Sequence, residues 1–344
     1  MAQQQLSARS AGWWPVVRRA AWPVYLVALA RWTWVNGLPY TEDLVFLWLI
    51  GALLAAAVHS GHGWRRALLV LRDWVPVMAA VLTYSLLRGF GAHTPWAPHL
   101  RPQLDFDTAL GLGQTLTVRL QHALYTPGTA HVYDYAAVTV YMSHFFVVFV
   151  LLAVLWRRDH PRFRRLLACY LALTYAAFLT YVLYPAVPPW MAGEQGALPE
   201  VTRIVADVLN QSGLPRAASV FEGGSRFAND VAAMPSLHAA YPMMIALFFW
   251  PVASRRVRVL LAAYPAAMAF TLVYGGEHFV IDILVGWTYA AVVVLGVNRL
   301  LDRRAARRAL RPGAAGAAGA EGAAVPEDTA AAPEVRRGAP ARTS

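Results

Sequence analysis

Long apolar stretches alternate with short polar segments along most of this chain. A helix needs about 20 apolar residues to cross a bilayer core, and fewer where protein shields its ends. The pattern predicts about eight membrane helices: Pro23–Val35, Leu44–Val58, Trp74–Leu87, Tyr135–Trp156, Leu166–Leu183, Leu237–Ala253, Val259–Tyr274 and Phe279–Leu300. Because no cleavage site follows the first stretch, we expect it to remain as a membrane helix. The fold class is therefore an all-α integral membrane protein.

Two segments depart from this pattern. Residues Leu104–Leu124 alternate apolar with polar side chains and contain two glycines, which predicts a short, broken amphipathic helix in the membrane interface. Residues Pro312–Ser344 are rich in Ala, Gly and Pro without apolar periodicity, which predicts disorder. We expect an N-terminal cytoplasmic segment (1–22), accessory membrane helices (23–74), a catalytic core of about six helices (75–302) and a disordered cytoplasmic tail (312–344).

Composition supports the membrane assignment. Of the 344 residues, 58% are hydrophobic and only 14% are charged, whereas charged residues make up roughly a quarter of a soluble domain. The net charge of +11 could indicate a nucleic-acid partner. The basic residues instead form short clusters between apolar stretches, as in membrane proteins whose topology they set. We therefore expect no nucleic-acid partner.

These arginine clusters predict the orientation. In an eight-helix arrangement they all fall on one side, which the positive-inside rule makes cytoplasmic. The clusters are Arg18-Arg19, Arg65-Arg66, Arg157–Arg165, Arg255–Arg258 and Arg303–Arg308. The opposite, extracytoplasmic side receives residues 88–134 and 184–233 and the turn at Gly275-Gly276. We expect a multi-pass protein of the cell membrane.

Two short motifs carry the candidate chemistry. One is the run Pro235–His238, and the other is Gly275–His278 followed by Asp282. Ionisable groups at membrane helices are costly and are usually functional. Both motifs fall on the extracytoplasmic side of the predicted topology. Together they indicate a catalytic site at that membrane surface.

Each motif has a chemical logic and a structural alternative. His278 and Asp282 are spaced i, i+4, so they share a helix face, and the carboxylate can orient the imidazole as a nucleophile or base. Ser236 is a good helix N-cap, and a helix N-terminus binds anions. His238 beside it could donate a proton to a leaving oxygen. A helix-to-helix His–Asp contact and an ordinary helix cap remain the alternatives.

The two motifs resemble the second and third signatures of the type 2 phosphatidic acid phosphatase superfamily. The Tyr184–Trp190 segment, with its three prolines, and the Asp134…Ser143-His144-Phe145 run resemble its inositolphosphotransferase branch, which includes inositol phosphorylceramide synthase. The resemblance covers about Tyr84 to Leu300. It implies a membrane lipid phosphate as substrate and an alcohol such as inositol, or water, as acceptor. It does not indicate an oligomeric state.

The resemblance also implies roles for individual residues. His278 would be the nucleophile that takes the phosphoryl group, Asp282 would orient it, and His238 would be the acid. Ser236 would help to hold the phosphate, and neither a metal nor another cofactor would be needed. We also expect His144 and Trp190 at the rim of the substrate site, with a helix-packing hydrogen bond as the alternative for His144.

The cationic phosphate ligands of the superfamily are not all matched. The third signature usually opens with Ser-Arg, but here those positions are Thr271 and Leu272. Of the first signature only Arg101-Pro102 looks similar, and Thr94 stands where a Lys is usual. Phosphoryl transfer still requires cations near the phosphate oxygens. Our candidates are Arg88, then Arg101 and Arg226, while Glu277 is expected to be solvated.

Three other functions use the same residues. Ser236 could be the nucleophile of an intramembrane serine hydrolase with His278 and Asp282, although it lacks a Gly-Xaa-Ser-Xaa-Gly elbow. His238, His278 and Asp282 could hold a mononuclear metal ion. A non-enzymatic lipid transporter or scaffold is the third alternative, and the lack of a detectable internal repeat argues against it.

Overall fold

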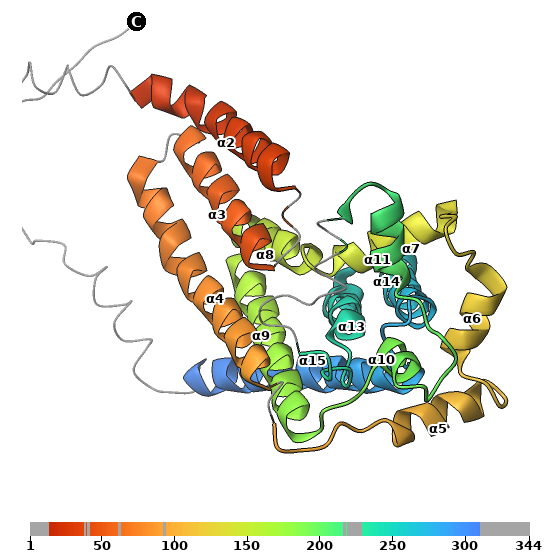
Figure 1. Ribbon diagram of the computed structural model, residues 1–344. Helices are drawn as coiled ribbons and strands as arrows, with labels where there is room; N and C mark the ends of the chain where they lie inside the picture. Colours follow the sequence, from red (N-terminus) through yellow and green to blue (C-terminus); the bar gives the residue numbers. More distant parts are fainter. Residues whose placement is uncertain are drawn as a thin grey trace, which may run out of the picture. The chain divides into compact units, whose positions relative to one another are not determined.

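The computed structural model describes residues 14–37, 39, 42–60, 63–91, 94–215, 218 and 229–309 (Figure 1). Within these residues the regular structure is helical, and two isolated bridges, His99 with Ala186 and Ala186 with Ala232, stand in place of strands. The all-α fold class is confirmed. The predicted tail at 312–344, residues 1–13 of the predicted N-terminal segment and the candidate Arg226 lie outside the described residues.

Every predicted membrane stretch corresponds to helix. The elements are α2 (Trp14–Asn36), α3 (Glu42–His59), α4 (Gly63–Gly91), α5 (Arg101–Leu110), α6 (Leu116–Leu124), α7 (Val132–Ser143), α8 (Val147–Arg158), α9 (His160–Leu183), α10 (Pro189–Glu194), α11 (Ile204–Gln211), α13 (Leu237–Phe249), the 3₁₀ turn η1 (Trp250–Val252), α14 (Arg255–Tyr274) and α15 (Val280–Ala309). The first compact unit, Met1–Asn298, contains the whole candidate site. A second unit begins at Arg299 and is described as far as Ala309, the end of α15.

The described helices differ in how well they suit a membrane. Four are long and apolar enough to cross one (65–91, 160–183, 255–274 and 280–308), while α3 and α13 are shorter apolar helices. The α7–α8 pair makes a fifth candidate, bent by 50°. The helix α2, which contains Arg31, is not among these candidates. The several long apolar helices indicate a multi-pass membrane protein, with fewer full-length spans than the eight predicted.

The bend in the fourth predicted stretch has a structural reason. The sequence predicted one span over Tyr135–Trp156, but the helix breaks after Ser143. The Ser143 hydroxyl bonds the Val140 carbonyl at 2.5 Å and the Tyr264 hydroxyl of α14 at 2.7 Å. The next side chain, His144, stacks on α13. Polar contacts with neighbouring helices thus replace lipid contacts at the break.

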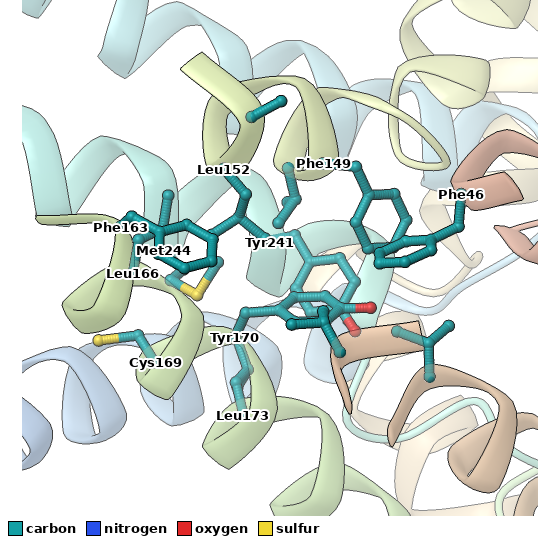
Figure 2. Close-up of a cluster of buried hydrophobic side chains, with 14 of the residues drawn as sticks. Phe46, Phe149, Leu152, Phe163, Leu166, Cys169, Tyr170, Leu173, Tyr241 and Met244 are labelled. Atoms are coloured by element: carbon teal, nitrogen blue, oxygen red, sulfur yellow. The ribbon is translucent and has the colours of Figure 1, made fainter. Parts of the chain in front are cut away.

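A large hydrophobic cluster connects α3, α4, α8, α9 and α13. Its fully buried members include Phe46, Leu152 and Met244. Figure 2 shows these side chains together with Phe149, Phe163, Leu166, Cys169, Tyr170, Leu173 and Tyr241. Close packing of this kind holds helices together even in lipid, where a hydrophobic driving force is absent. Through Tyr241 and Met244 the cluster fixes α13, whose first turn carries the Pro235–His238 motif.

The amphipathic segment folds as two short helices, α5 and α6, separated by a turn at residues 111–115, so the predicted break is confirmed. The buried Asp107 carboxylate accepts the N–H of Leu116 at 2.9 Å and the N–H of Val280 at 3.0 Å. The first bond begins α6 and the second reaches the start of α15. The α5–α6 turn is therefore attached to the helix that carries Asp282.

Candidate active site

The fold brings the two histidine motifs together. His238 lies in the first turn of α13, and His278 lies in the turn between α14 and α15. Their ring centroids are 6.0 Å apart and the rings are tilted by 50°. A reacting atom that lies about 3 Å from each of two groups would fit between rings at this separation.

Asp282 stands behind His278. Its Oδ2 is 3.5 Å from His278 Nδ1, which is an ion-pair distance and longer than an ordinary hydrogen bond. The same oxygen accepts the N–H of Phe279 at 3.0 Å. Asp282 is wholly buried, and among the residues that the structure describes neither its Oδ1 nor His278 Nδ1 has a hydrogen-bond partner. The carboxylate thus faces one imidazole nitrogen and leaves Nε2 as the nitrogen directed away from it.

A close backbone contact joins the two motifs. The Ser236 N–H donates to the Asp282 carbonyl at 3.0 Å. One turn further along α15, a Cβ on Gly286 would lie 2.5 Å from the Ser236 carbonyl oxygen. Since real Cβ atoms do not approach that closely, a glycine is required for α15 to reach the start of α13. Gly286 therefore helps to place Asp282 beside the first motif.

The turn that carries His278 is closely covered. Gly276 adopts φ +75°, and a Cβ there would lie 2.7 Å from Val201 Cγ1 and 3.0 Å from the Thr202 carbonyl. The Gln121 amide donates to the carbonyls of Tyr274 (2.8 Å) and Thr202 (2.9 Å) and accepts the Thr202 N–H. The 201–203 segment therefore lies against the glycine turn. No sequence pattern pointed to Gln121.

His238 lies among aromatic rings. It stacks on His144 at 3.9 Å between centroids and on Tyr141 at 4.7 Å, and Phe145 meets it edge-on at 5.9 Å. Its Nε2 is buried and has no hydrogen-bond partner in the described part of the chain. Tyr141 lies in the last turn of α7, and His144 and Phe145 lie in the break between α7 and α8. The sequence placed His144 at the rim, but the structure packs it directly against His238.

Ser236 caps α13 as predicted. The side chain is fully buried, and its Oγ accepts the Ala239 N–H at 3.3 Å. The Tyr181 hydroxyl donates to the Pro235 carbonyl at 2.7 Å, which fixes the residues before the cap. No hydrogen bond joins Ser236 to either imidazole among the described residues. This arrangement favours a capping and anion-binding role over a serine nucleophile.

The candidate arginines occupy different environments. Arg88, near the end of α4, is half-buried, and its charge acts on the rings of His144 and His238. Arg101 is exposed at the start of α5. Trp190, in the first turn of α10, donates its backbone N–H to the Gly276 carbonyl at 3.0 Å. Arg88 is thus the candidate cation that the structure brings near the imidazoles.

Glu277 is not solvated, so that expectation was wrong. It is 8% exposed, and Arg203 holds it with two hydrogen bonds of 3.1 Å from Nε and Nη2. The guanidinium also lies 4.5 Å from the centre of the Trp190 ring. Burial lowers the pKa of Arg203, and the Glu277 carboxylate outweighs burial and raises it above its ordinary value. Sequence reasoning missed Arg203 because a pair 74 residues apart leaves no local pattern.

Among the residues described, no group of three or more His, Cys, Asp and Glu side chains lies close enough together to hold a metal ion. The mononuclear metal alternative, which needed His238, His278 and Asp282 as ligands, therefore has no ligand cluster to support it in this part of the chain.

A helical membrane protein with two facing imidazoles, one backed by a carboxylate, matches the type of site that the sequence resemblance implied. Residues 104–296 match the PAP2 superfamily, and the chain belongs to this superfamily. It is also 28% identical over 196 residues to the phosphoinositol dihydroceramide synthase of Bacteroides thetaiotaomicron. That match covers 50% of this chain and 63% of the relative, so the chain spans less than two thirds of that protein's length. No solved structure matches the chain.

Proposed function

We propose that this protein is a membrane enzyme that transfers a phosphoryl or phosphate-containing headgroup from a lipid through a phosphohistidine at His278. One observation carries the proposal: the His238 and His278 rings are 6.0 Å apart, with Asp282 behind His278. This arrangement supports a reaction in which a nucleophile with its orienting group and a proton donor lie on either side of one phosphorus atom.

In the first step, the lone pair of His278 Nε2 attacks phosphorus and forms an N–P bond. The bond from phosphorus to the leaving alcohol oxygen breaks, and His238 donates a proton to that oxygen. Asp282 stabilises the positive charge that develops on the His278 ring. Arg88 and the N–H groups at the start of α13, which Ser236 caps, stabilise the charge on the phosphate oxygens.

In the second step, the hydroxyl of an acceptor attacks the phosphohistidine. His238 takes the proton of that hydroxyl, the N–P bond breaks, and both histidines return to their starting states. An alcohol acceptor makes the protein a transferase, whereas water makes it a lipid phosphate phosphatase. The name of the Bacteroides relative describes the synthesis of a phosphoinositol dihydroceramide, in which the phosphate is esterified to two alcohols, and this favours an alcohol over water as acceptor.

We also propose that the site opens at the extracytoplasmic surface of the cell membrane. The arginine cluster at 157–165 lies where α8 ends and α9 begins, and the cluster at 255–258 lies at the start of α14. The turn that carries His278 follows the other end of α14. The positive-inside rule makes the arginine ends cytoplasmic. Labelling of single cysteines, introduced at Arg157 and Thr126 in a Cys169→Ala background, with a membrane-impermeant maleimide tests this orientation, because only the extracytoplasmic position should react in intact cells.

The decisive experiment traps the intermediate. Full-length protein in detergent is mixed with ³²P-labelled lipid phosphates, and acid-labile, alkali-stable label on the protein is measured. The label is then chased with water, inositol or another alcohol. We expect label on wild-type protein and on His122→Ala, a control that removes an exposed histidine of α6, but none on His278→Ala. Turnover without such a label, or label retained by His278→Ala, would contradict the proposal.

A further inference from the structure

The residues around His278 are held by several separate elements. The Glu277 and His278 N–H groups both donate to the Leu272 carbonyl, at 3.0 and 3.3 Å. Trp190 of α10 holds the Gly276 carbonyl, and Asp107 of α5 holds the Val280 N–H. These contacts fix the backbone on both sides of His278. A nucleophile that must meet phosphorus in line benefits from this fixation, because misplacement by about 1 Å can cost 10²-fold in rate.

The Arg203–Glu277 pair holds the residue directly before His278 through its side chain. Its two 3.1 Å hydrogen bonds form a bidentate fork, a geometry that resists rotation as well as separation. Trp190 lies against the guanidinium at 4.5 Å, and its backbone N–H holds the preceding residue, Gly276. The pair therefore links α10 and the start of α11 to the turn.

The same pair affects the charge of the site. Glu277 directly precedes the proposed nucleophile, and a bare carboxylate there would repel an incoming phosphate. The charge of Arg203 offsets it, and this charge also acts on Tyr141, the ring that stacks on His238. Arg203 thus pairs with the residue next to His278 without being one of the arginines that the sequence predicted.

We infer that Arg203 is a positioning residue, which through its paired hydrogen bonds to Glu277 holds the Gly276–His278 turn so that His278 meets the lipid phosphate in line. This inference rests on the proposed function for its kinetic consequences. It assigns Arg203 no direct contact with the phosphate. Lysine cannot replace it, because an ammonium lacks the planar fork that matches a carboxylate and stacks on indole.

Three variants separate positioning from charge. We expect Arg203→Gln to lower kcat about 100-fold and to raise KM, because Glu277 is then left unpaired beside the substrate. In R203Q/E277Q that repulsion is gone, so KM returns to the wild-type value while kcat stays low. The reversed pair R203E/E277R restores the ion pair and recovers kcat to within about tenfold, as expected for two coupled residues.

The control is Arg258→Gln. Arg258 also lies over a tryptophan, 5.7 Å from the ring of Trp250, and its Nε donates to the Trp250 carbonyl. It is at the opposite end of α14, about 25 Å from the turn at 1.5 Å per residue. We expect kcat and KM of this variant to match those of wild type. The unfolding midpoint of each variant in detergent is measured alongside.

The assay uses short-chain phosphatidic acid with and without inositol, and it follows phosphate release and transfer. A second measurement needs no turnover: the rate at which diethylpyrocarbonate modifies His278, followed by mass spectrometry, with His122 as the internal reference. We expect this rate at His278 to rise severalfold in Arg203→Gln and R203Q/E277Q, because a loosened turn opens more often, and to fall back in the reversed pair.

The outcomes are distinguishable. Wild-type kcat in R203Q/E277Q would show that Arg203 only neutralises a charge, and a KM that stays high in that variant would show that Arg203 binds the phosphate itself. Either result overturns the positioning role, as does unchanged modification of His278 in Arg203→Gln. Failure of the proposed function has a different signature: His278→Ala keeps activity, or wild type has none, whatever the behaviour of the Arg203 variants.

Discussion

The two histidine motifs lie side by side in space but are built differently. His238 begins a helix and is surrounded by rings, those of Tyr141, His144 and Phe145. His278 lies in a turn whose neighbours are held by hydrogen bonds, and a buried carboxylate, Asp282, faces its Nδ1. One imidazole is thus held by stacking and the other by a polar framework.

The different surroundings of the two histidines bear on the step of phosphoryl transfer that each is proposed to perform. A histidine that becomes covalently phosphorylated develops positive charge, and a facing carboxylate stabilises that charge. A histidine that acts as an acid must first carry the proton as an imidazolium. The face of an aromatic ring, such as that of Tyr141 beside His238, attracts a cation. We therefore keep His278 as the proposed nucleophile and His238 as the proposed acid, the roles that the resemblance implied.

The strongest test of this contrast removes each imidazole in turn. We expect His278→Ala to lower the rate of transfer by at least about 10⁴-fold, as loss of a nucleophile does in enzymes whose catalytic groups act as a unit. Phosphatidic acid turnover and trapped ³²P label both measure this loss. If His238→Ala lost the label while His278→Ala kept it, the two roles would have to be exchanged.

The second test uses leaving groups. We expect His238→Ala to lower the rate on lipid phosphates by about 10²- to 10⁴-fold, the usual contribution of general acid catalysis. On p-nitrophenyl phosphate the loss should be far smaller, because a nitrophenolate leaves without a proton. The ratio of the two rates in wild type and variant measures the effect. Equal losses on both substrates would mean that His238 binds the phosphate instead of protonating the leaving oxygen.

The third test concerns Ser236, the serine of the first motif. Because Ser236 Oγ caps α13, we expect Ser236→Ala to cost about 1 kcal/mol of stability. We expect turnover to change by about tenfold or less, since α13 keeps its N–H groups. Thermal unfolding in detergent and initial rates measure the two effects. Loss of activity as complete as that of His278→Ala would instead favour a serine nucleophile and make the contrast between the histidines secondary.

The sequence predicted the helices and the proximity of the two motifs for physical reasons. The length of the apolar stretches predicted the positions of α4, α9, α14 and α15, because the thickness of a bilayer fixes how many apolar residues a membrane helix needs. The break after Ser143 was missed, since it depends on contacts of Ser143 with Tyr264 and of His144 with His238. Such contacts join residues far apart in the chain, and hydropathy carries no information about them.

The same limit applied to the site. His238, His278, Ser236 and Asp282 could be named because each lies in a short motif with its own chemical logic. The environment of Glu277 could not, because it is decided by Arg203, a residue without any local signal. Gly286 was also missed, although it allows the close approach of α15 to Ser236. Local spacing identifies the reacting groups, whereas the groups that hold them come from tertiary structure.

The smallest effect that we expect concerns Asp107, which belongs to the hydrogen-bonded framework around His278. Burial raises the pKa of this carboxyl above its ordinary value of 3.8, the negative charge of Asp282 adds to the rise, and the N–H groups of Val280 and Leu116 oppose it. The folded protein therefore binds this proton more tightly than the unfolded chain. The stability that protonation contributes is fully present below the unfolded pKa and is lost as pH rises through the raised folded pKa.

Asp107→Asn cannot ionise, so it should not show this loss. We expect the unfolding midpoint of the variant, relative to wild type in the same detergent, to improve as the pH rises above 3.8, by an amount equivalent to about 1 kcal/mol. Asp105→Asn, at an exposed position of the same helix, is the matched control and should show no such trend. A variant that instead lost stability relative to wild type with rising pH would mean that the ionised carboxylate stabilises the start of α15. The framework around His278 would then depend on the charge of Asp107, whereas the stacking of rings around His238 does not depend on it.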